Sequence, residues 1–268
     1  MTLVQAVALG VLQGVTEFLP ISSSGHLALA QTLLGRNPEA ALLFSVVLHL
    51  GTTAAILWVL RARVGRLVGA LYSLRRPSAL DPGLATERRW LGLIVVASIP
   101  TGLAGLGLRH FVEDMSQRPV WIGLAFLLTM ALLLSAERIG ARRRGAEALT
   151  ALDALCVGCA QSVGILPGVS RSGSTITVAL WRDATPEVAV EFSILISVPA
   201  ILGANLLELL SGGAQATAGA LALGVGFTAS LLTGVAALHA LVWVVRERRL
   251  TGFALYCGVL GLGAILVG

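Results

Sequence analysis

The chain carries the same unusual motif twice. Residues 13–26 read QGVTEFLPISSSGH and residues 161–175 read QSVGILPGVSRSGST, so Gln13 and Gln161 lie 148 positions apart. The same offset relates further pairs: Ser24 and Ser172, Gly25 and Gly173, Glu39 and Glu187, Phe44 and Phe192, Ser45 and Ser193. Each copy places proline, glycine and several hydroxyls inside an apolar stretch, where a broken backbone needs buried partners or a cavity. Paired interruptions in the two halves of a membrane protein predict its binding site.

The composition is that of a membrane protein. Hydrophobic residues make up 56% of the chain and charged residues 12%, whereas a soluble domain carries about 25% charged residues. The mean hydropathy is +0.87. These values exclude an ordinary soluble domain. We therefore expect the lipid bilayer, and not a nucleic acid, to be the partner of most of the surface.

Six segments are long and apolar enough to cross a bilayer core of about 30 Å as helices. They cover residues 40–60, 90–108, 119–137, 187–210, 218–245 and 252–267. Arginines are unevenly spread between them: seven lie in residues 61–89, four in 138–144 and three in 246–249, against three in the alternate loops. Basic loops stay on the cytoplasmic side. We expect these polar, arginine-rich stretches to be cytoplasmic loops and both termini to lie outside.

The two motif segments, residues 3–35 and 151–182, are long enough for two half-helices each but are broken in the middle. We interpret each as a re-entrant hairpin with its turn at the motif. Three full spans separate them, so the second hairpin enters from the opposite face and the two turns meet near the midplane. Two ordinary kinked spans are the alternative.

The expected fold class is therefore an all-α integral membrane protein, a single membrane domain over residues 1–268. It has an inverted-topology repeat, with about six transmembrane helices and two re-entrant helical hairpins. Repeat 1 covers about residues 1–118 and repeat 2 about residues 150–268.

Glu17 is a carboxylate inside an apolar segment, which costs a few kcal/mol and marks a candidate functional residue. Gln13 lies one helical turn earlier, so the two side chains share a helix face. A carboxylate and an amide oxygen suit a hard cation such as Mg²⁺ or Ca²⁺. Glu17 and Gln13 are thus the predicted metal ligands. In the alternative interpretation, Glu17 only binds the broken backbone of its own hairpin.

Two histidines lie in or near the first hairpin. His26 follows a run of serines and a glycine, and its ordinary titration range suits proton transfer near neutral pH. A satisfied core histidine is the alternative. For His49, in the next span, we expect a core hydrogen bond, and a place near the site is the alternative.

Arg171 is the one arginine placed inside an apolar segment away from a loop. Its planar fork matches a phosphate group. A turn rich in glycine and serine that opens a half-helix also presents backbone N–H groups to an anion. The residues of this turn are Gly168, Ser170, Ser172, Gly173, Ser174 and Thr175. The alternative is a pair between Arg171 and Glu17 that only locks the hairpins together.

Together the motifs supply a carboxylate, an imidazole, a guanidinium and many hydroxyls. This set favours hydrolysis of a phosphoanhydride, in which metal and arginine neutralise the phosphate and a serine or a water attacks in line. A site at membrane depth implies a lipid substrate.

At these residues the chain resembles the bacterial undecaprenyl-diphosphate phosphatases, the bacitracin-resistance proteins. QGVTEFLPISSSGH is similar to their first signature and LPGVSRSGST to their second, and FSVVLHLGT and EFSILISVP are similar too. The resemblance implies an enzyme of the bacterial inner membrane that regenerates undecaprenyl phosphate for peptidoglycan synthesis.

By position in the motifs, the resemblance implies catalytic roles for Glu17, Ser23, His26 and Arg171. It implies substrate binding by Gln13, Ser22, Ser170, Ser172 and Thr175, and the composition of the two turns adds Ser24, Gly168 and Gly173 to the predicted substrate-binding residues. Whether Ser23, His26 or a water is the nucleophile stays open. Many members of the family have glutamate where this chain has Gln13, so Glu17 carries the acid–base or main metal role here.

The remaining expectations concern partners and access. The predicted partners are a polyprenyl diphosphate lipid, a divalent cation and a second copy of the chain in a homodimer. The pocket is expected to open to the outer, periplasmic side. A transporter or flippase of a polyprenyl phosphate or another anion is the competing function, since carriers are often built as inverted repeats.

Overall fold

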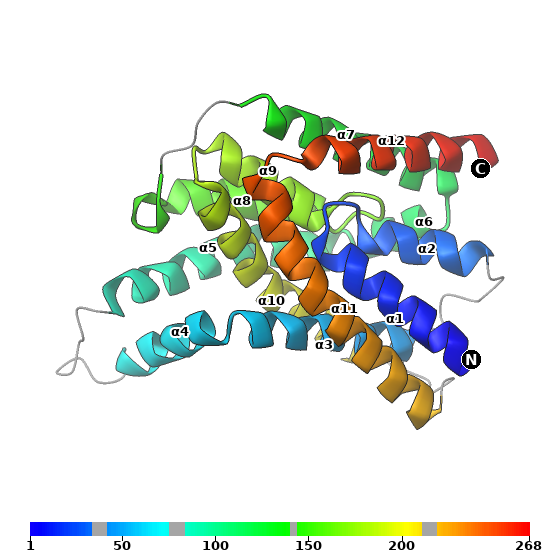
Figure 1. Ribbon diagram of the computed structural model, residues 1–268, viewed down its shortest axis with the longest axis horizontal. Coiled ribbons are helices and arrows are strands. Elements are labelled where there is room, and N and C mark those ends of the chain that lie inside the picture. The colour runs from blue at the N-terminus through cyan, green and yellow to red at the C-terminus, as the bar shows by residue number, and fades with distance from the viewer. Residues whose placement is uncertain (34–41, 75–83, 140–143, 211–218) are drawn as a thin grey trace.

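The computed structural model describes residues 1–33, 42–74, 84–139, 144–210 and 219–268 (Figure 1). This part of the chain is built from α-helices and contains no strand, apart from one isolated bridge between Arg144 and Ala184. The helices are α1 Leu3–Phe18, α2 Ser23–Leu33, α3 Leu42–Val59, α4 Arg61–Ser73, α5 Ala85–Gly107, α6 Arg109–Ser116, α7 Pro119–Glu137, α8 Ala151–Val163, α9 Arg171–Trp181, α10 Pro186–Leu210, α11 Ala220–Arg246 and α12 Leu250–Val267.

Five of these helices, α5, α7, α10, α11 and α12, are long and apolar enough to cross a membrane. A sixth span is possible if Leu43–Val59 and Arg61–Ser73, which meet at an angle of 85°, count as one. The all-α membrane architecture predicted from hydropathy is confirmed. The expected loop after residue 60 is wrong in its first part, because Arg61–Ser73 forms the helix α4. Its buried face, which includes Leu67 and Ala70, explains why so polar a sequence is helical.

Both motif segments form two short helices separated by a turn. α2 and α9 begin 148 residues apart, at Ser23 and Arg171, and end 148 residues apart. The preceding helices also begin alike: Thr2 and Thr150 each cap a helix and form a reciprocal capping box with the residue three positions later. The repeat seen in the sequence therefore extends to the local structure of both hairpins.

Each hairpin packs against a helix from the other half of the chain. α1 lies along α11, α8 lies along α5, and α7 lies against α12 (Figure 1). These contacts are close because small residues line them: a Cβ on Gly158 would lie 2.3 Å from the Ala97 carbonyl oxygen, and one on Gly123 would lie 2.5 Å from that of Gly261. Close approach at small residues is how membrane helices associate without a hydrophobic driving force. This interlocking brings the two motif turns together.

Candidate active site

The first turn ends α1 and starts α2. Pro20 has no N–H to continue the helix, and Ser22 adopts φ 67°, in the left-handed region that few non-glycine residues occupy. Surrounding bonds hold it there. The Ser22 hydroxyl accepts from the backbone N–H of Gly25 at 3.3 Å and of Gly168 at 3.1 Å. The second of these donors belongs to the other hairpin.

The second turn repeats this design. Ser170 is the N-cap of α9, and its hydroxyl accepts from the Gly173 N–H at 3.0 Å. Ser22 and Gly25 are the counterparts of Ser170 and Gly173 at the 148-residue offset. Gly168 has φ 98°, which glycine adopts without strain. The predicted substrate-binding residues Ser22, Ser170 and Gly173 therefore shape the turns through these bonds.

The two turns are in direct contact. Besides the bond from Gly168 to Ser22, the Ser172 hydroxyl donates to the Leu19 carbonyl at 3.3 Å. A Cβ on Gly25 would lie 2.8 Å from the Gly168 Cα. Motifs 148 residues apart in sequence thus form one composite site, as the repeat predicts.

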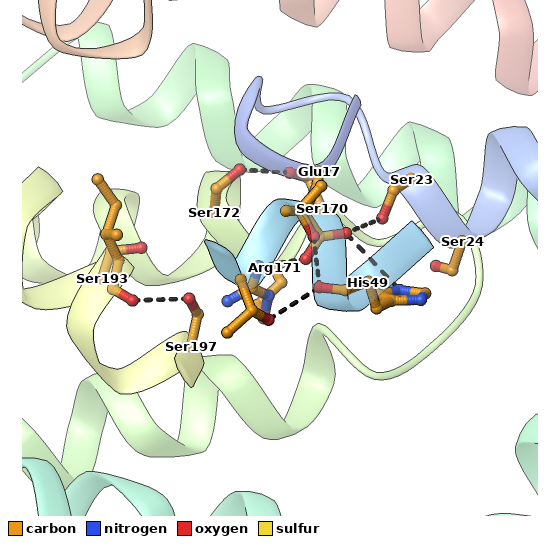
Figure 2. A network of polar contacts seen from close by, with 12 residues as sticks. Glu17, Ser23, Ser24, His49, Ser170, Arg171, Ser172, Ser193 and Ser197 are labelled. Atoms are coloured by element: carbon orange, nitrogen blue, oxygen red, sulfur yellow. Dashed lines mark hydrogen bonds and ion pairs between the residues drawn. The ribbon is translucent and has the colours of Figure 1, made fainter. Parts of the chain in front are cut away.

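Glu17 lies at the centre of this site (Figure 2). Its Oε1 accepts from the Arg171 guanidinium at 2.5 Å, and its Oε2 accepts from Ser23 at 2.6 Å and from the Gln13 amide at 3.0 Å. Glu17 is 6% exposed. A buried carboxylate needs such partners to offset its lost hydration. The Glu17–Arg171 pair named in the locking interpretation is present, and so is the Ser23 bond, which that interpretation does not require.

His49 has the expected core hydrogen bond and also lies near this carboxylate. Its Nδ1 makes the predicted core hydrogen bond, to the Ser45 carbonyl at 2.9 Å, and because a carbonyl only accepts, Nδ1 carries the proton. Its Nε2, however, lies 3.9 Å from Glu17 Oε2 (Figure 2). A single histidine in an apolar span carries no signal for this second contact.

His26 lies beside the first turn, on α2. Its Nδ1 lies 2.7 Å from the Ser22 carbonyl and its Nε2 lies 2.8 Å from the Tyr256 hydroxyl. The ring stacks parallel to Tyr256 and edge-on to Phe126. Both ring nitrogens thus have partners in the structure. Neither of these is Glu17 or Arg171.

The remaining predicted residues lie around the turns. Ser24 is exposed, and its hydroxyl lies 3.4 Å from that of Ser22. Thr175 is buried, donates to the Arg171 carbonyl at 2.7 Å, and lies 2.6 Å from the Ser193 hydroxyl. Ser24 can therefore reach a ligand from the surface, whereas Thr175 supports the backbone behind Arg171.

The model of the family described as bacitracin resistance protein BacA matches residues 6–263. The chain belongs to this family. It is 40% identical over 261 residues to an undecaprenyl-diphosphatase of Syntrophotalea carbinolica, covering 97% of each chain. It is also 37% identical over 268 residues to one of Korarchaeum cryptofilum, covering 99% of each chain.

In this BacA-family chain, two residues that the motifs do not contain hold the turns in place. Thr129 of α7 bonds to both Gly168 and Ser170 of the second turn, and Tyr256 of α12 bonds to His26 of the first. Neither carries a sequence signal, since hydroxyls in apolar helices are common and usually bond within their own helix.

The predicted cation ligands, Glu17 and Gln13, both lie on the buried face of α1. Among the described residues, no three His, Cys, Asp or Glu side chains gather in a metal-binding cluster. Glu17 does share a buried face with the Gln13 Oε1 atom, which has no hydrogen-bond partner there. Mg²⁺ is often held by one or two carboxylates together with substrate phosphates. The donor set of this BacA-family site therefore fits a hard cation that binds together with a diphosphate.

Proposed function

We propose that this protein hydrolyses undecaprenyl diphosphate to undecaprenyl phosphate and inorganic phosphate. The reaction recycles the lipid carrier of peptidoglycan synthesis and confers resistance to bacitracin. One observation carries the proposal: a carboxylate, a serine hydroxyl and a guanidinium converge where two helix breaks meet within a bundle of membrane-spanning helices. The names of the BacA-family relatives agree with it and do not favour the transporter.

Arg171 and the turn around it are proposed to bind the diphosphate. A guanidinium has five N–H donors, so its contact with Glu17 leaves others for phosphate oxygens. Ser170 caps the start of α9, where backbone N–H groups and the helix dipole attract an anion. Ser24 and Ser172 are proposed to add hydroxyl contacts to the phosphates.

We assign the nucleophile to Ser23, because its hydroxyl donates to Glu17 whereas both nitrogens of His26 have other partners. A nucleophile that donates to an adjacent base is the usual sign of activation. The Ser23 oxygen bonds to the terminal phosphorus as the bond to the bridging oxygen breaks. Undecaprenyl phosphate leaves with that electron pair, and the Ser23 proton passes to Glu17. Water then hydrolyses the phosphoserine and restores the hydroxyl. His26 keeps the proton-transfer role implied by the family.

A divalent cation, Mg²⁺ or Ca²⁺, is proposed to be held by Glu17 and the Gln13 Oε1 atom together with the diphosphate. When bound, it would neutralise charge on the phosphate oxygens. Phosphate release by purified protein in detergent, with and without chelator, tests both proposals. We expect phosphate from undecaprenyl diphosphate, none from undecaprenyl phosphate, and loss of release with chelator. Transfer of polyprenyl phosphate across liposomes without phosphate release would instead support the carrier.

The site is proposed to lie in the inner membrane within an inverted repeat and to open to the periplasmic side, because arginines concentrate at the opposite ends of the helices. Ser24→Cys, in a background with Cys156 and Cys159 replaced by alanine, should react with an impermeant maleimide on spheroplasts. Arg138→Cys, at the arginine-rich end of α7, is the control and should react after permeabilisation alone. The opposite pattern would invert the topology.

A homodimer is part of the proposal. Native mass spectrometry in mild detergent tests it, and a monomer at every protein concentration would remove it.

A further inference from the structure

The helices α7 and α12 pack against each other, and each contacts the turn of one hairpin. The two contacted residues occupy the same position in the repeat. The Thr129 hydroxyl of α7 donates to the Gly168 carbonyl at 2.9 Å, and the Cys257 thiol of α12 lies 3.8 Å from the Pro20 carbonyl. Pro20 and Gly168 are counterparts at the 148-residue offset. The helix pair therefore forms a common support for both motif turns.

The contact from Thr129 is the more extensive of the two. Its hydroxyl also accepts from the Ser170 N–H at 2.9 Å, and the side chain is 1% exposed. A hydroxyl has one proton and two lone pairs, and the Thr129 proton lies within reach of two carbonyl oxygens, that of Gly168 at 2.9 Å and that of Ala125 on its own helix at 3.2 Å. A single side chain thus satisfies a buried carbonyl and a buried N–H on either side of Val169.

The hydrogen bond from Thr129 and the packing against α7 restrain the turn in opposite directions. A Cβ on Gly168 would lie 2.5 Å from the Ile122 carbonyl oxygen, so the backbone of the turn cannot move closer to α7. The Thr129 hydroxyl keeps the turn from moving away. Ser170 is the N-cap of α9 and Arg171 is the first residue of that helix, so the position of the Arg171 backbone depends on this bond.

We propose that Thr129 is a positioning residue for the reaction: its hydroxyl fixes the Gly168–Ser170 backbone and so aims Arg171 at the diphosphate. The role rests on the proposed function of the site. It acts through the turn, without contact between Thr129 and the substrate.

Thr129→Val and Thr129→Ser separate the hydroxyl from the packing. Valine keeps the shape but leaves two buried backbone groups without a partner, so we expect the catalytic efficiency to fall at least about 10-fold. Serine keeps the hydroxyl and should stay within about 3-fold of wild type despite its missing methyl group. A role in packing alone predicts the reverse order, and that result would overturn the proposal.

Thr177→Val is the matched control. Thr177 of α9 is also fully buried, but its hydroxyl has no hydrogen-bond partner among the described residues. Its replacement by valine should leave efficiency within about 2-fold of wild type, because no bond is lost. An equal loss in Thr177→Val and Thr129→Val would show a general cost of altering buried threonines near the site.

Hydrogen exchange measures, without any substrate, how strongly Thr129 restrains the backbone of the second turn; we call this restraint the clamp. The backbone amides of residues 164–174 should exchange faster in Thr129→Val than in wild type, and at the wild-type rate in Thr129→Ser and Thr177→Val. If the wild-type protein released no phosphate, the proposed function would fail and the exchange data would still decide whether the clamp exists. Unchanged exchange in Thr129→Val would refute it.

Discussion

The two hairpin turns share a framework and differ in chemistry. Both have a threonine capping box at the start and a serine that accepts from a glycine N–H three residues later. At the 148-residue offset, however, Glu17 corresponds to Ile165 and Ser23 to Arg171. The first turn thus carries the carboxylate and the hydroxyl, and the second carries the guanidinium that pairs with the carboxylate.

This division has an electrostatic reason. The turns meet across a buried interface, where two like charges would repel strongly and neither would be compensated. Opposite charges, one from each turn, stabilise each other, and the other oxygen of the carboxylate stays bonded to the Ser23 hydroxyl. The repeated backbone provides the position, and a few differing side chains provide the charged pair.

Glu17→Gln should have the largest effect on turnover, because it removes the negative charge of the first turn, and the second turn has Ile165 at the corresponding position. The amide keeps the size and an oxygen that accepts from Arg171, so folding should be near normal. Turnover should fall at least about 100-fold, the scale of a lost general base. Phosphate release at saturating substrate measures this.

Glu113→Gln on the surface helix α6 is the control. The hydrogen bond from Arg109 lowers the pKa of the Glu113 carboxyl, so this carboxylate is also ionised at neutral pH. Its loss should not change turnover. A Glu17→Gln enzyme that stayed active while losing thermal stability would support the interpretation that the Glu17–Arg171 pair only locks the hairpins.

Arg171→Lys tests the second turn. Lysine keeps the charge but loses the planar fork, so we expect catalytic efficiency to fall about 30-fold or more. The loss should appear mainly as a higher KM if the fork binds ground-state phosphate and mainly as a lower kcat if it binds only the transition state. Arg246→Lys, whose arginine pairs with Glu187 on the surface, is the matched control. Near-normal efficiency in Arg171→Lys would leave Arg171 as a general positive charge.

Cys257→Ala compares the contact between Cys257 and the first turn with the contact between Thr129 and the second turn. A thiol is a weak donor, and its contact with Pro20 is long, at 3.8 Å. We expect efficiency within about 3-fold of wild type, well above that of Thr129→Val. A loss as large as that of Thr129→Val would mean that the first turn needs its support equally.

Gln13→Glu should have the smallest effect on activity. The Gln13 amide donates to Glu17 at 3.0 Å, and a carboxylate in its place would repel Glu17 unless a cation or a proton lies between them. The proposed cation would lie between them. Activity with Mg²⁺ should stay within about 3-fold of wild type, while the Mg²⁺ concentration for half-maximal activity falls. An inactive variant, or one with unchanged Mg²⁺ dependence, would count against Gln13 as a cation ligand.

The sequence predicted the features that depend on neighbouring residues. Hydropathy is a sum over one segment, so six spans could be predicted within a few residues of the helices observed. Proline, glycine and serine break or cap a helix locally, so the breaks near Pro20 and Gly168 could be placed as well. α4 was not predicted because its arginines make the segment polar on average. Its apolar face is narrow, and it stabilises the helix only by packing against the rest of the protein.

By itself, then, the sequence determined that this is a helical membrane protein, where its helices break, and which side chains are concentrated at those breaks. Only the tertiary structure decided which of these groups meet. The Glu17–Arg171 pair joins residues 154 positions apart and the His26–Tyr256 bond joins residues 230 positions apart. His49 and Thr129 reach the two motifs in the same way, because of the side of the helix that faces the site. Such contacts depend on how whole helices pack, a property that no single segment of sequence contains.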